Sequence, residues 1–198
     1  MWPFYPQSCI ACGKEQLRGL TCGACVKNTN VSGIISAGRY QYAPLRRGIR
    51  WLKFKGVRPV APTLASHLIE RLPLIVPLSE LVQTAAFIPI PLHHTRLTRR
   101  GFNQSEDIAD ALTAATGVAT LPLLSRHKMT FAQAELPEDL RSQNVDQAFV
   151  LTGAIPKNVR LLMLLDDVAT TGTTLSAAAQ ALHQSFDGPI WAVTLARG

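Results

Sequence analysis

The sequence contains no uninterrupted apolar run long enough to cross a membrane. Its most hydrophobic region, residues 72–92, is broken by Glu80 and by four prolines, whereas a transmembrane helix needs about 20 mostly apolar residues. The first six residues have neither the basic start nor the apolar stretch of an export signal. We therefore expect a cytoplasmic protein without a membrane span.

Two common phosphate-binding motifs are also absent. The chain has no Gly-x-x-x-x-Gly-Lys-Ser/Thr and no Gly-x-Gly-x-x-Gly after a strand. Acidic residues are scarce, and the net charge of +7 predicts attraction to polyanions, which include nucleic acids and phosphorylated metabolites. A length of 198 residues suits one α/β domain with a small appendage.

Only four cysteines occur, and they form two Cys-x-x-Cys pairs near the N-terminus. Gly13 and Gly23 lie within or beside the pairs, so the backbone has room to hydrogen-bond the sulfurs. This spacing is typical of a closed, structural zinc site. Two disulfides, a redox dithiol or an iron–sulfur cluster are the alternatives. We predict a zinc module over residues 1–30, with the ligands Cys9, Cys12, Cys22 and Cys25.

The most informative stretch runs from Leu161 to Leu175. Its first five residues are apolar without alternation, which predicts a strand buried on both faces of a parallel sheet. Two acids follow, at the carboxyl edge where such sheets bind ligands. A threonine-rich loop around Gly172 then leads into helix formers, and the N–H groups of such a loop hold phosphate. The predicted ligand-binding positions are Asp166, Asp167, Val168, Ala169, Thr170, Thr171, Gly172, Thr173 and Thr174.

Carboxylates beside a phosphate cradle have a specific use. They accept hydrogen bonds from the vicinal hydroxyls of a ribose and, directly or through water, help to hold Mg²⁺. The stretch resembles the signature of type I phosphoribosyltransferases, which binds the ribose 5-phosphate part of phosphoribosyl pyrophosphate (PRPP). The alternative is a buried strand with ordinary turn acids and a helix N-cap.

Seven basic residues lie between positions 39 and 58 with no acid among them. Residues 44–55 read as a helix with an apolar stripe of Leu45, Ile49 and Leu52. The simplest interpretation is a solvated basic face, and the alternative is a patch for single-stranded DNA. The opposite face carries Arg46, Arg47, Arg50 and Lys53. The aromatic side chains available for stacking on bases are Tyr40, Tyr42, Trp51 and Phe54.

A second basic stretch follows a short strand predicted over residues 87–92, which prolines terminate. We expect a loop here, whose guanidinium groups can grip a diphosphate, and we interpret the two histidines as loop donors or surface residues. Asn103 is the expected N-cap of a helix whose Ile108, Leu112 and Ala115 share a face. The pyrophosphate-loop candidates are His93, His94, Arg96, Arg99 and Arg100.

Residues 125–147 are polar and show no clear period. Such a long irregular segment between predicted strands at 118–123 and 161–165 is either a functional lid or a surface excursion. In phosphoribosyltransferases a flexible loop in the corresponding region closes over PRPP, and the resemblance implies the same here. The lid candidates are Arg126, Lys128, Gln133, Arg141 and Asn144. A last buried strand is predicted over residues 190–195.

Several segments together resemble the ComF/GntX family of competence and DNA-utilisation proteins. The characteristic one is Pro-Ile-Pro-Leu at residues 89–92, followed by Arg96 and by Arg-Gly-Phe-Asn-Gln at 100–104. Further matches in the same order are the four cysteines, residues 52–56, Arg141-x-x-Asn144, Ala148-Phe149, residues 166–174 and residues 194–197. The similarity covers nearly the whole chain.

The resemblance implies a phosphoribosyltransferase-like domain over residues 31–198, with a parallel sheet flanked by helices, after the zinc module of residues 1–30. It implies a protein that binds PRPP or a related ribose phosphate with Mg²⁺ and assists uptake or utilisation of exogenous DNA. Single-stranded DNA, through segment 39–58, and other DNA-processing proteins are the expected partners. The alternative is an active phosphoribosyltransferase acting on a base or amine, although no base-binding hood is recognisable.

Overall fold

The computed structural model describes residues 7–127 and 148–198. Five strands form one sheet in the order β1-β7-β6-β2-β3, and each neighbouring pair is parallel. This arrangement confirms the predicted parallel α/β sheet. The strands are Gly33–Arg39 (β1), Ala85–Pro89 (β2), Ala119–Thr120 (β3), Leu161–Ala169 (β6) and Ile190–Arg197 (β7).

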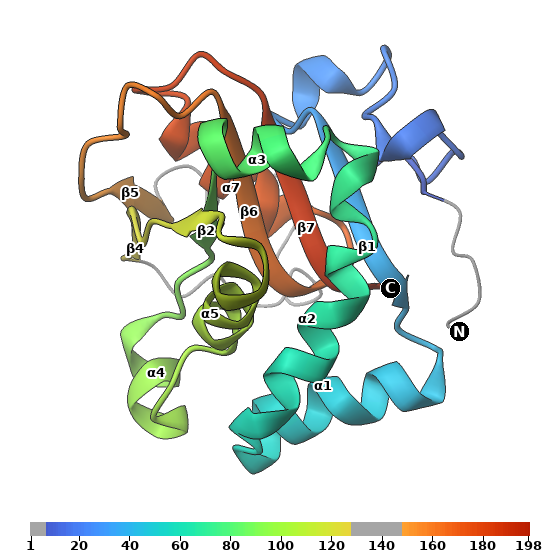
Figure 1. Cartoon of the computed structure of the whole chain (residues 1–198), viewed down its shortest axis with the longest axis vertical. Helices are drawn as coiled ribbons and strands as arrows, with labels where there is room; N and C mark the ends of the chain where they lie inside the picture. The colour runs from blue at the N-terminus through green and yellow to red at the C-terminus, as the bar shows by residue number, and fades with distance from the viewer. Residues whose placement is uncertain (1–6, 128–147) are drawn as a thin grey trace, which may run out of the picture.

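Helices cover both faces of the sheet (Figure 1). One buried cluster joins the sheet to α1, α2 and α5, and the other joins it to α7. Alternate residues of β6 enter the two clusters, Met163 and Leu165 the first and Leu162 and Leu164 the second, as the period of a strand requires. The helices are Ala43–Lys55 (α1), Ala61–Ile69 (α2), Leu78–Thr84 (α3), His94–Arg100 (α4), Gln104–Thr116 (α5) and Thr173–Leu182 (α7).

The carboxyl end of β6 extends beyond its neighbour β2. Pairing with β7 continues to Ala169, which lies opposite Arg197, whereas pairing with β2 stops at Leu165 opposite Pro89. The last backbone hydrogen bond from β2 to β6 runs from Ile90 N–H to Leu165 O at 2.9 Å. The residues of β6 after Leu165 therefore stand at the sheet edge, on the side where α1 and α4 also lie (Figure 1).

One expectation about the helices was wrong. Residues 94–100 form the short helix α4 rather than a loop, because His93 caps its start and Gly101, at φ +79°, ends it. In α5 the buried face is Ile108, Ala109 and Leu112, while Ala115 is exposed. The N-cap prediction for α5 is confirmed, since the Asn103 side chain accepts a hydrogen bond from Ser105 N–H.

The segment expected to be irregular begins with a strand. Leu124–Arg126 (β4) pairs antiparallel with Phe149–Leu151 (β5), so residues 125 and 126 belong to a two-stranded sheet that brackets residues 128–147. The strand predicted over 118–123 is reduced to β3, at residues 119–120. Lys128, Gln133, Arg141 and Asn144 lie outside the described residues.

The N-terminal segment packs against the second face of the sheet. Its Ile10 and Val31 belong to the same buried cluster as β6 and α7, and Leu20 forms a bridge with Gly33 at the start of β1. The division of the chain at residue 30 stays a prediction. Within residues 7–127 and 148–198, each helix is too short or too polar to cross a membrane.

Candidate functional site

The two acids after Leu165 differ in their surroundings. Asp167 is buried, and its Oδ2 lies 2.7 Å from Nζ of Lys53 in α1. Its backbone N–H donates a hydrogen bond to Asp166 Oδ1 at 2.8 Å. Sequence reasoning missed Lys53 and placed it on the basic face. Its position four residues after the buried Ile49 was the available signal, because that spacing places both on one side of a helix.

Asp166 is the acid whose ionisation is perturbed. Burial, together with the neighbouring Asp167 carboxylate, raises the pKa of Asp166 to about 8, and Lys53 acts in the opposite direction. Two carboxylates in close contact resist ionising together. A hydroxyl donor or a cation that reached Asp166 would favour its charged form, so this carboxyl is poised to respond to a ligand.

The threonine-rich loop leads into α7 through a left-handed glycine. Gly172 adopts φ +76° as the N-cap of α7, a conformation that side chains other than glycine rarely adopt. The Thr171 and Thr173 hydroxyls lie 2.8 Å apart, and Ser176 N–H closes the first turn onto Gly172 O. The first N–H groups of α7 have no partner within the helix, and its dipole adds positive charge there.

Three arginines of α4 and β4 interact electrostatically with the acids or with one another. Burial lowers the pKa of Arg100, against the attraction of Asp167, and burial lowers the pKa of Arg126, against the attraction of Asp166. The charge of Arg96 acts on both arginines. Arg100 of α4 and Arg126 of β4 thus interact electrostatically with the acids, and Arg96 of α4 interacts with both arginines.

The two histidines have unlike positions. His93 is buried and caps α4, because its Nδ1 accepts a hydrogen bond from Thr95 N–H, whereas His94 is exposed. Burial, and then the charges of His94, Arg126 and Arg96, lower the pKa of His93. The interpretation of His93 as a loop donor or surface residue was wrong, and this side chain organises the start of α4. Arg99 is exposed.

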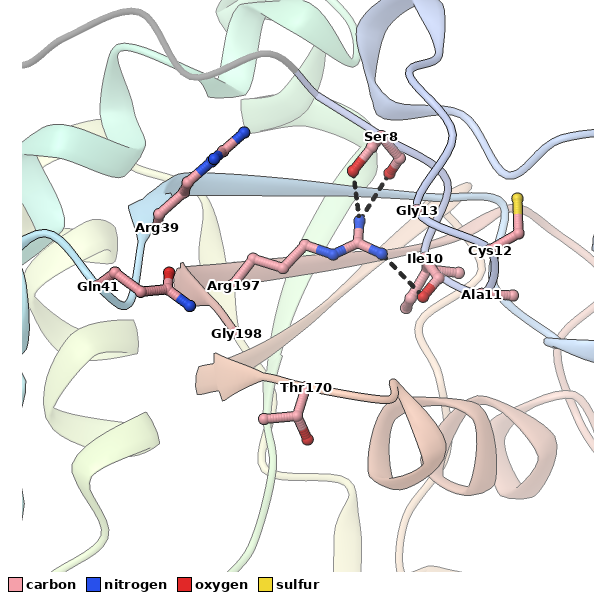
Figure 2. Close-up of a pocket in the computed structure, with 10 residues that line it drawn as sticks. All are labelled: Ser8, Ile10, Ala11, Cys12, Gly13, Arg39, Gln41, Thr170, Arg197 and Gly198. Carbon is pink, nitrogen blue, oxygen red and sulfur yellow. Dashed lines mark hydrogen bonds between the residues drawn. The ribbon is translucent and has the colours of Figure 1, made fainter.

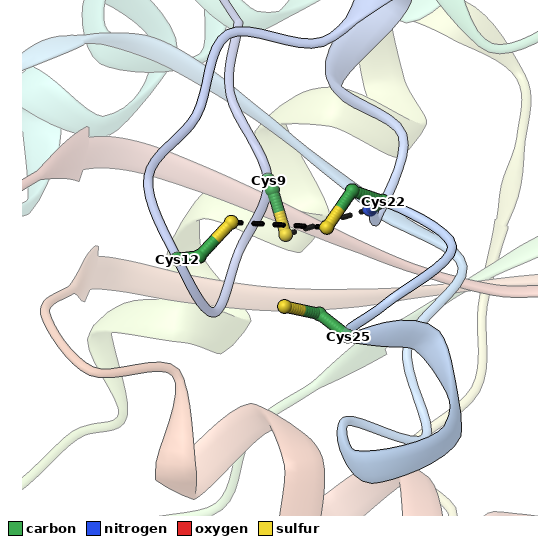
Figure 3. A group of neighbouring side chains, drawn as sticks. All are labelled: Cys9, Cys12, Cys22 and Cys25. Carbon is green, nitrogen blue, oxygen red and sulfur yellow. Dashed lines mark hydrogen bonds between the residues drawn. The ribbon is translucent and has the colours of Figure 1, made fainter.

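The four cysteines converge on one point (Figure 3). Their Sγ atoms all lie within 4.8 Å of one another, and Cys12 Sγ is 3.7 Å from Cys22 Sγ. Zn–S bonds of about 2.3 Å give tetrahedral S···S distances of about 3.8 Å. Cys22 N–H also donates to Cys9 Sγ at 3.5 Å. The residues fit a metal ion such as zinc, and a closed four-sulfur shell makes it structural.

Thiol ionisation in this cluster is uneven. Burial raises the pKa of Cys9, but hydrogen bonds from the backbone of Cys12, Cys22 and Ala11 outweigh it and bring the pKa to about 6. Hydrogen bonding with Cys22 raises the pKa of Cys25 to about 12. Cys9 therefore loses its proton readily, whereas the Cys25 thiol resists losing its proton. A bound divalent metal would favour the deprotonated form of Cys25.

Arg197, at the end of β7, ties the cysteine segment to the sheet (Figure 2). Its Nη1 donates to Ser8 O at 2.8 Å and to Ser8 Oγ, and its Nη2 donates to Cys9 O and to Ile10 O at 3.0 Å. A pocket of about 420 Å³ lies beside it, lined by this segment, by the ends of β1 and β7 and by Thr170. The cysteine segment thus lies directly beside the threonine-rich loop.

The exposed basic surface of α1 contains fewer residues than the sequence indicated. Lys53 pairs with Asp167 and leaves the exposed face of α1, whereas Arg58 holds Asp107 with Nε and Nη2 and stays exposed. Tyr40 packs against the core. The exposed basic residues of α1 are Arg46, Arg47, Arg50 and Lys55, and the exposed aromatic residues beside them are Tyr42 (38% exposed), Trp51 (41%) and Phe54 (65%).

Known proteins similar to this chain are named for competence and DNA utilisation. It is 33% identical over 182 residues to competence protein F of Haemophilus influenzae, an alignment that covers 89% of this chain and 78% of that protein. It is 30% identical to DNA utilization protein YhgH of Salmonella typhimurium and 29% to that of Escherichia coli K12, with 88% of this chain and 77% of each relative covered. No protein-family model matches.

Proposed function

Because the chain belongs to the ComF family of competence and DNA-utilisation proteins, we propose that it binds PRPP or a related ribose phosphate and assists the uptake or utilisation of exogenous DNA. The observation that carries the ribose-phosphate proposal is the meeting of two features at one sheet edge. The left-handed Gly172 at the start of α7 provides a phosphate cradle, and Asp166 and Asp167 stand at the end of β6, a few residues before it.

The chemistry of the site divides between its elements. The loop from Thr170 to Thr174 would hold the 5-phosphate, and Asp166 would accept a hydrogen bond from a ribose hydroxyl. Mg²⁺ bound with the diphosphate would neutralise part of its charge, with Asp166 as the carboxyl able to reach it directly or through water. Arg96 and Arg100 would bind the diphosphate itself, since guanidinium groups match phosphate oxygens.

The remaining parts of the proposal concern the zinc module and DNA. We propose that residues 1–30 form the zinc-binding module and residues 31–198 the ribose-phosphate domain, with Arg126 as a lid contact. The exposed basic and aromatic face of α1 is the proposed contact for single-stranded DNA. Binding to other DNA-processing proteins is part of the same role.

Phosphoribosyl transfer is the second candidate function, favoured by the basic groups that α4 and β4 bring to the acids. In this reaction a base or amine attacks C1 of the ribosyl group as the bond from C1 to the pyrophosphate oxygen breaks. Arg96, Arg100 and Mg²⁺ would stabilise the departing charge. Release of pyrophosphate with an acceptor panel would support transfer, and silence across the panel would favour the accessory role.

Calorimetric titration with PRPP and with ribose 5-phosphate, each with Mg²⁺, tests the binding proposal. We expect Asp166→Asn/Asp167→Asn to weaken binding at least about tenfold, because hydrogen bonds to charged groups are lost. Asp187→Asn is the matched control, since Asp187 is an exposed acid preceding β7 at the opposite sheet edge. Absence of heat with the parent protein would refute the proposal.

A further inference from the structure

Lys53 lies within the basic run of α1 but does not share its surroundings. Its side chain is 27% exposed, and its ammonium contacts the carboxylate of Asp167, whose side chain is 5% exposed. A buried carboxylate needs a partner, because an unpaired charge in the protein interior is strongly unfavourable. Lys53 therefore serves the carboxyl end of β6 and not the exposed face of α1.

The alternation of β6 from Leu161 to Leu165 leads to Asp167 on the side of α1. Leu161, Met163 and Leu165 pack in the cluster that contains α1, α2 and α5, so Asp167 comes next on that side, where Lys53 contacts it. Asp166 follows Leu162 and Leu164, which pack in the other cluster.

Other charged groups reach the pair from α4 and β4. Arg100 interacts electrostatically with Asp167, but its Nη1 donates to Gln104 Oε1. Arg126 acts on Asp166. Among the residues described, Lys53 is the group in direct ionic contact with Asp167.

A chain of contacts connects Lys53 to Asp166. The ammonium of Lys53 holds the Asp167 carboxylate, and the Asp167 backbone N–H donates to Asp166 Oδ1 at 2.8 Å. The ion pair anchors the end of β6 to α1, and this end carries the N–H that orients Asp166. One oxygen of Asp166 is occupied by this bond, and a carboxylate has two oxygens with which to accept hydrogen bonds.

We propose that Lys53 is a positioning residue for the pentose: by pairing with Asp167 it orients Asp166 to accept a hydrogen bond from the vicinal hydroxyls of a ribose 5-phosphate. This inference rests on the proposed ribose-phosphate function and deepens it. Lys53 sets the preference for ribose over 2-deoxyribose, whereas affinity for the phosphate group comes from the separate loop around Gly172.

Three ligands separate these contributions: ribose 5-phosphate, 2-deoxyribose 5-phosphate and inorganic phosphate, titrated into the zinc-loaded full chain. We expect Lys53→Met to weaken ribose 5-phosphate binding about tenfold, the cost of one hydrogen bond to a charged group. Binding of the other two ligands should change less than about twofold, because their affinity comes from the loop around Gly172, and substitutions at separate sites act nearly independently. Lys53→Arg should restore the preference, and Lys55→Met, on the exposed side of α1, should leave it unchanged.

The double variant Lys53→Met/Asp167→Asn covers the case in which Lys53→Met fails to fold, because it leaves no unpaired buried charge. It should melt cooperatively and lack the ribose preference. An intact preference in either variant, or an equal loss for all three ligands, would overturn the role of Lys53 alone. Failure of the parent protein to bind any of the three ligands would instead overturn the ribose-phosphate function, and the Lys53 inference with it.

Discussion

Asp166 and Asp167 are neighbours in sequence, yet only Asp167 has a direct cationic partner among the described residues. The raised pKa of Asp166, about 8, means that the folded protein keeps a proton there that the unfolded chain releases near pH 4. Between these two pH values folding must take up a proton, so it becomes less favourable as the pH rises. The stability assigned to Asp166 is complete below about pH 4 and is lost as the pH rises toward 8.

Asp166→Asn should remove this pH dependence. We expect the parent to lose more unfolding free energy between pH 5 and pH 8 than the variant, because asparagine does not titrate. Urea unfolding midpoints, measured without Mg²⁺ or phosphate ligands, provide the comparison, and other titrating groups cancel in the difference. Parallel pH profiles for parent and variant would show that Asp166 ionises normally in the folded protein.

Single residues were identified from sequence when their chemistry is local. The acids and the cysteines were found because short spacings bring such groups together whatever the rest of the chain does. Lys53 and the cap at His93 were missed, because their partners depend on how helices pack at the sheet edge. The same reason applies to Arg58, whose partner Asp107 lies in α5.

Among the elements, α1 has two sides that differ in burial and in chemistry. Leu45, Ile49 and Leu52 are buried against the sheet, as the helical period predicted. The other side exposes basic residues together with Trp51 and Phe54. Large exposed aromatic side chains beside arginines are typical of surfaces that bind single strands, where bases stack on the rings and the backbone meets positive charge.

Neutralising the basic face of α1 should weaken binding of single-stranded oligonucleotides. For the triple change Arg46→Gln/Arg47→Gln/Arg50→Gln we expect the slope of log affinity against log salt to fall by about 2, since each phosphate contact on a single strand contributes about 0.7. Trp51→Ala/Phe54→Ala should lower affinity about tenfold or more through lost stacking and leave the slope unchanged.

Fluorescence anisotropy with an oligothymidine at several salt concentrations measures both effects. The matched control is Lys157→Gln/Arg160→Gln, which removes exposed basic residues before β6, at the opposite sheet edge. An unchanged salt slope in the triple variant, or an equal loss in the control, would exclude α1 as the DNA contact.

At the scale of the whole molecule, the segment that carries the four cysteines contacts the threonine-rich loop. A Cβ placed on Gly172 would lie 2.8 Å from Ile10 Cγ1, so Ile10, one residue after the ligand Cys9, packs directly on the loop. Arg197 holds the backbone of the same segment. A metal bound by the four cysteines would therefore stabilise a segment that packs against the threonine-rich loop.

Removing the metal should disturb the loop as well as the module. We expect chelation of zinc to lower the melting temperature and to speed amide exchange in residues 170–175, because a structural site contributes folding energy. Ile10→Ala should cost about 2 to 4 kcal/mol of unfolding free energy and speed exchange in the same residues.

Val26→Ala is the control, since Val26 lies in the module but is 43% exposed. Hydrogen exchange followed by mass spectrometry gives the readout by segment, and metal analysis confirms the zinc content before and after chelation. Unaltered exchange in residues 170–175 of both the chelated protein and the Ile10→Ala variant would show that the loop is independent of the module.

The sequence by itself determined the class of sheet, the cysteine quartet, the acid pair and its threonine loop. These features are local: a buried strand, a turn and a helix start are encoded within some fifteen consecutive residues, and ligand spacing within two short pairs. Only the tertiary structure decided that Lys53 pairs with Asp167, that residues 94–100 are helical and that Ile10 packs against Gly172. Contacts between segments far apart in the chain depend on the packing of whole elements, which no local pattern specifies.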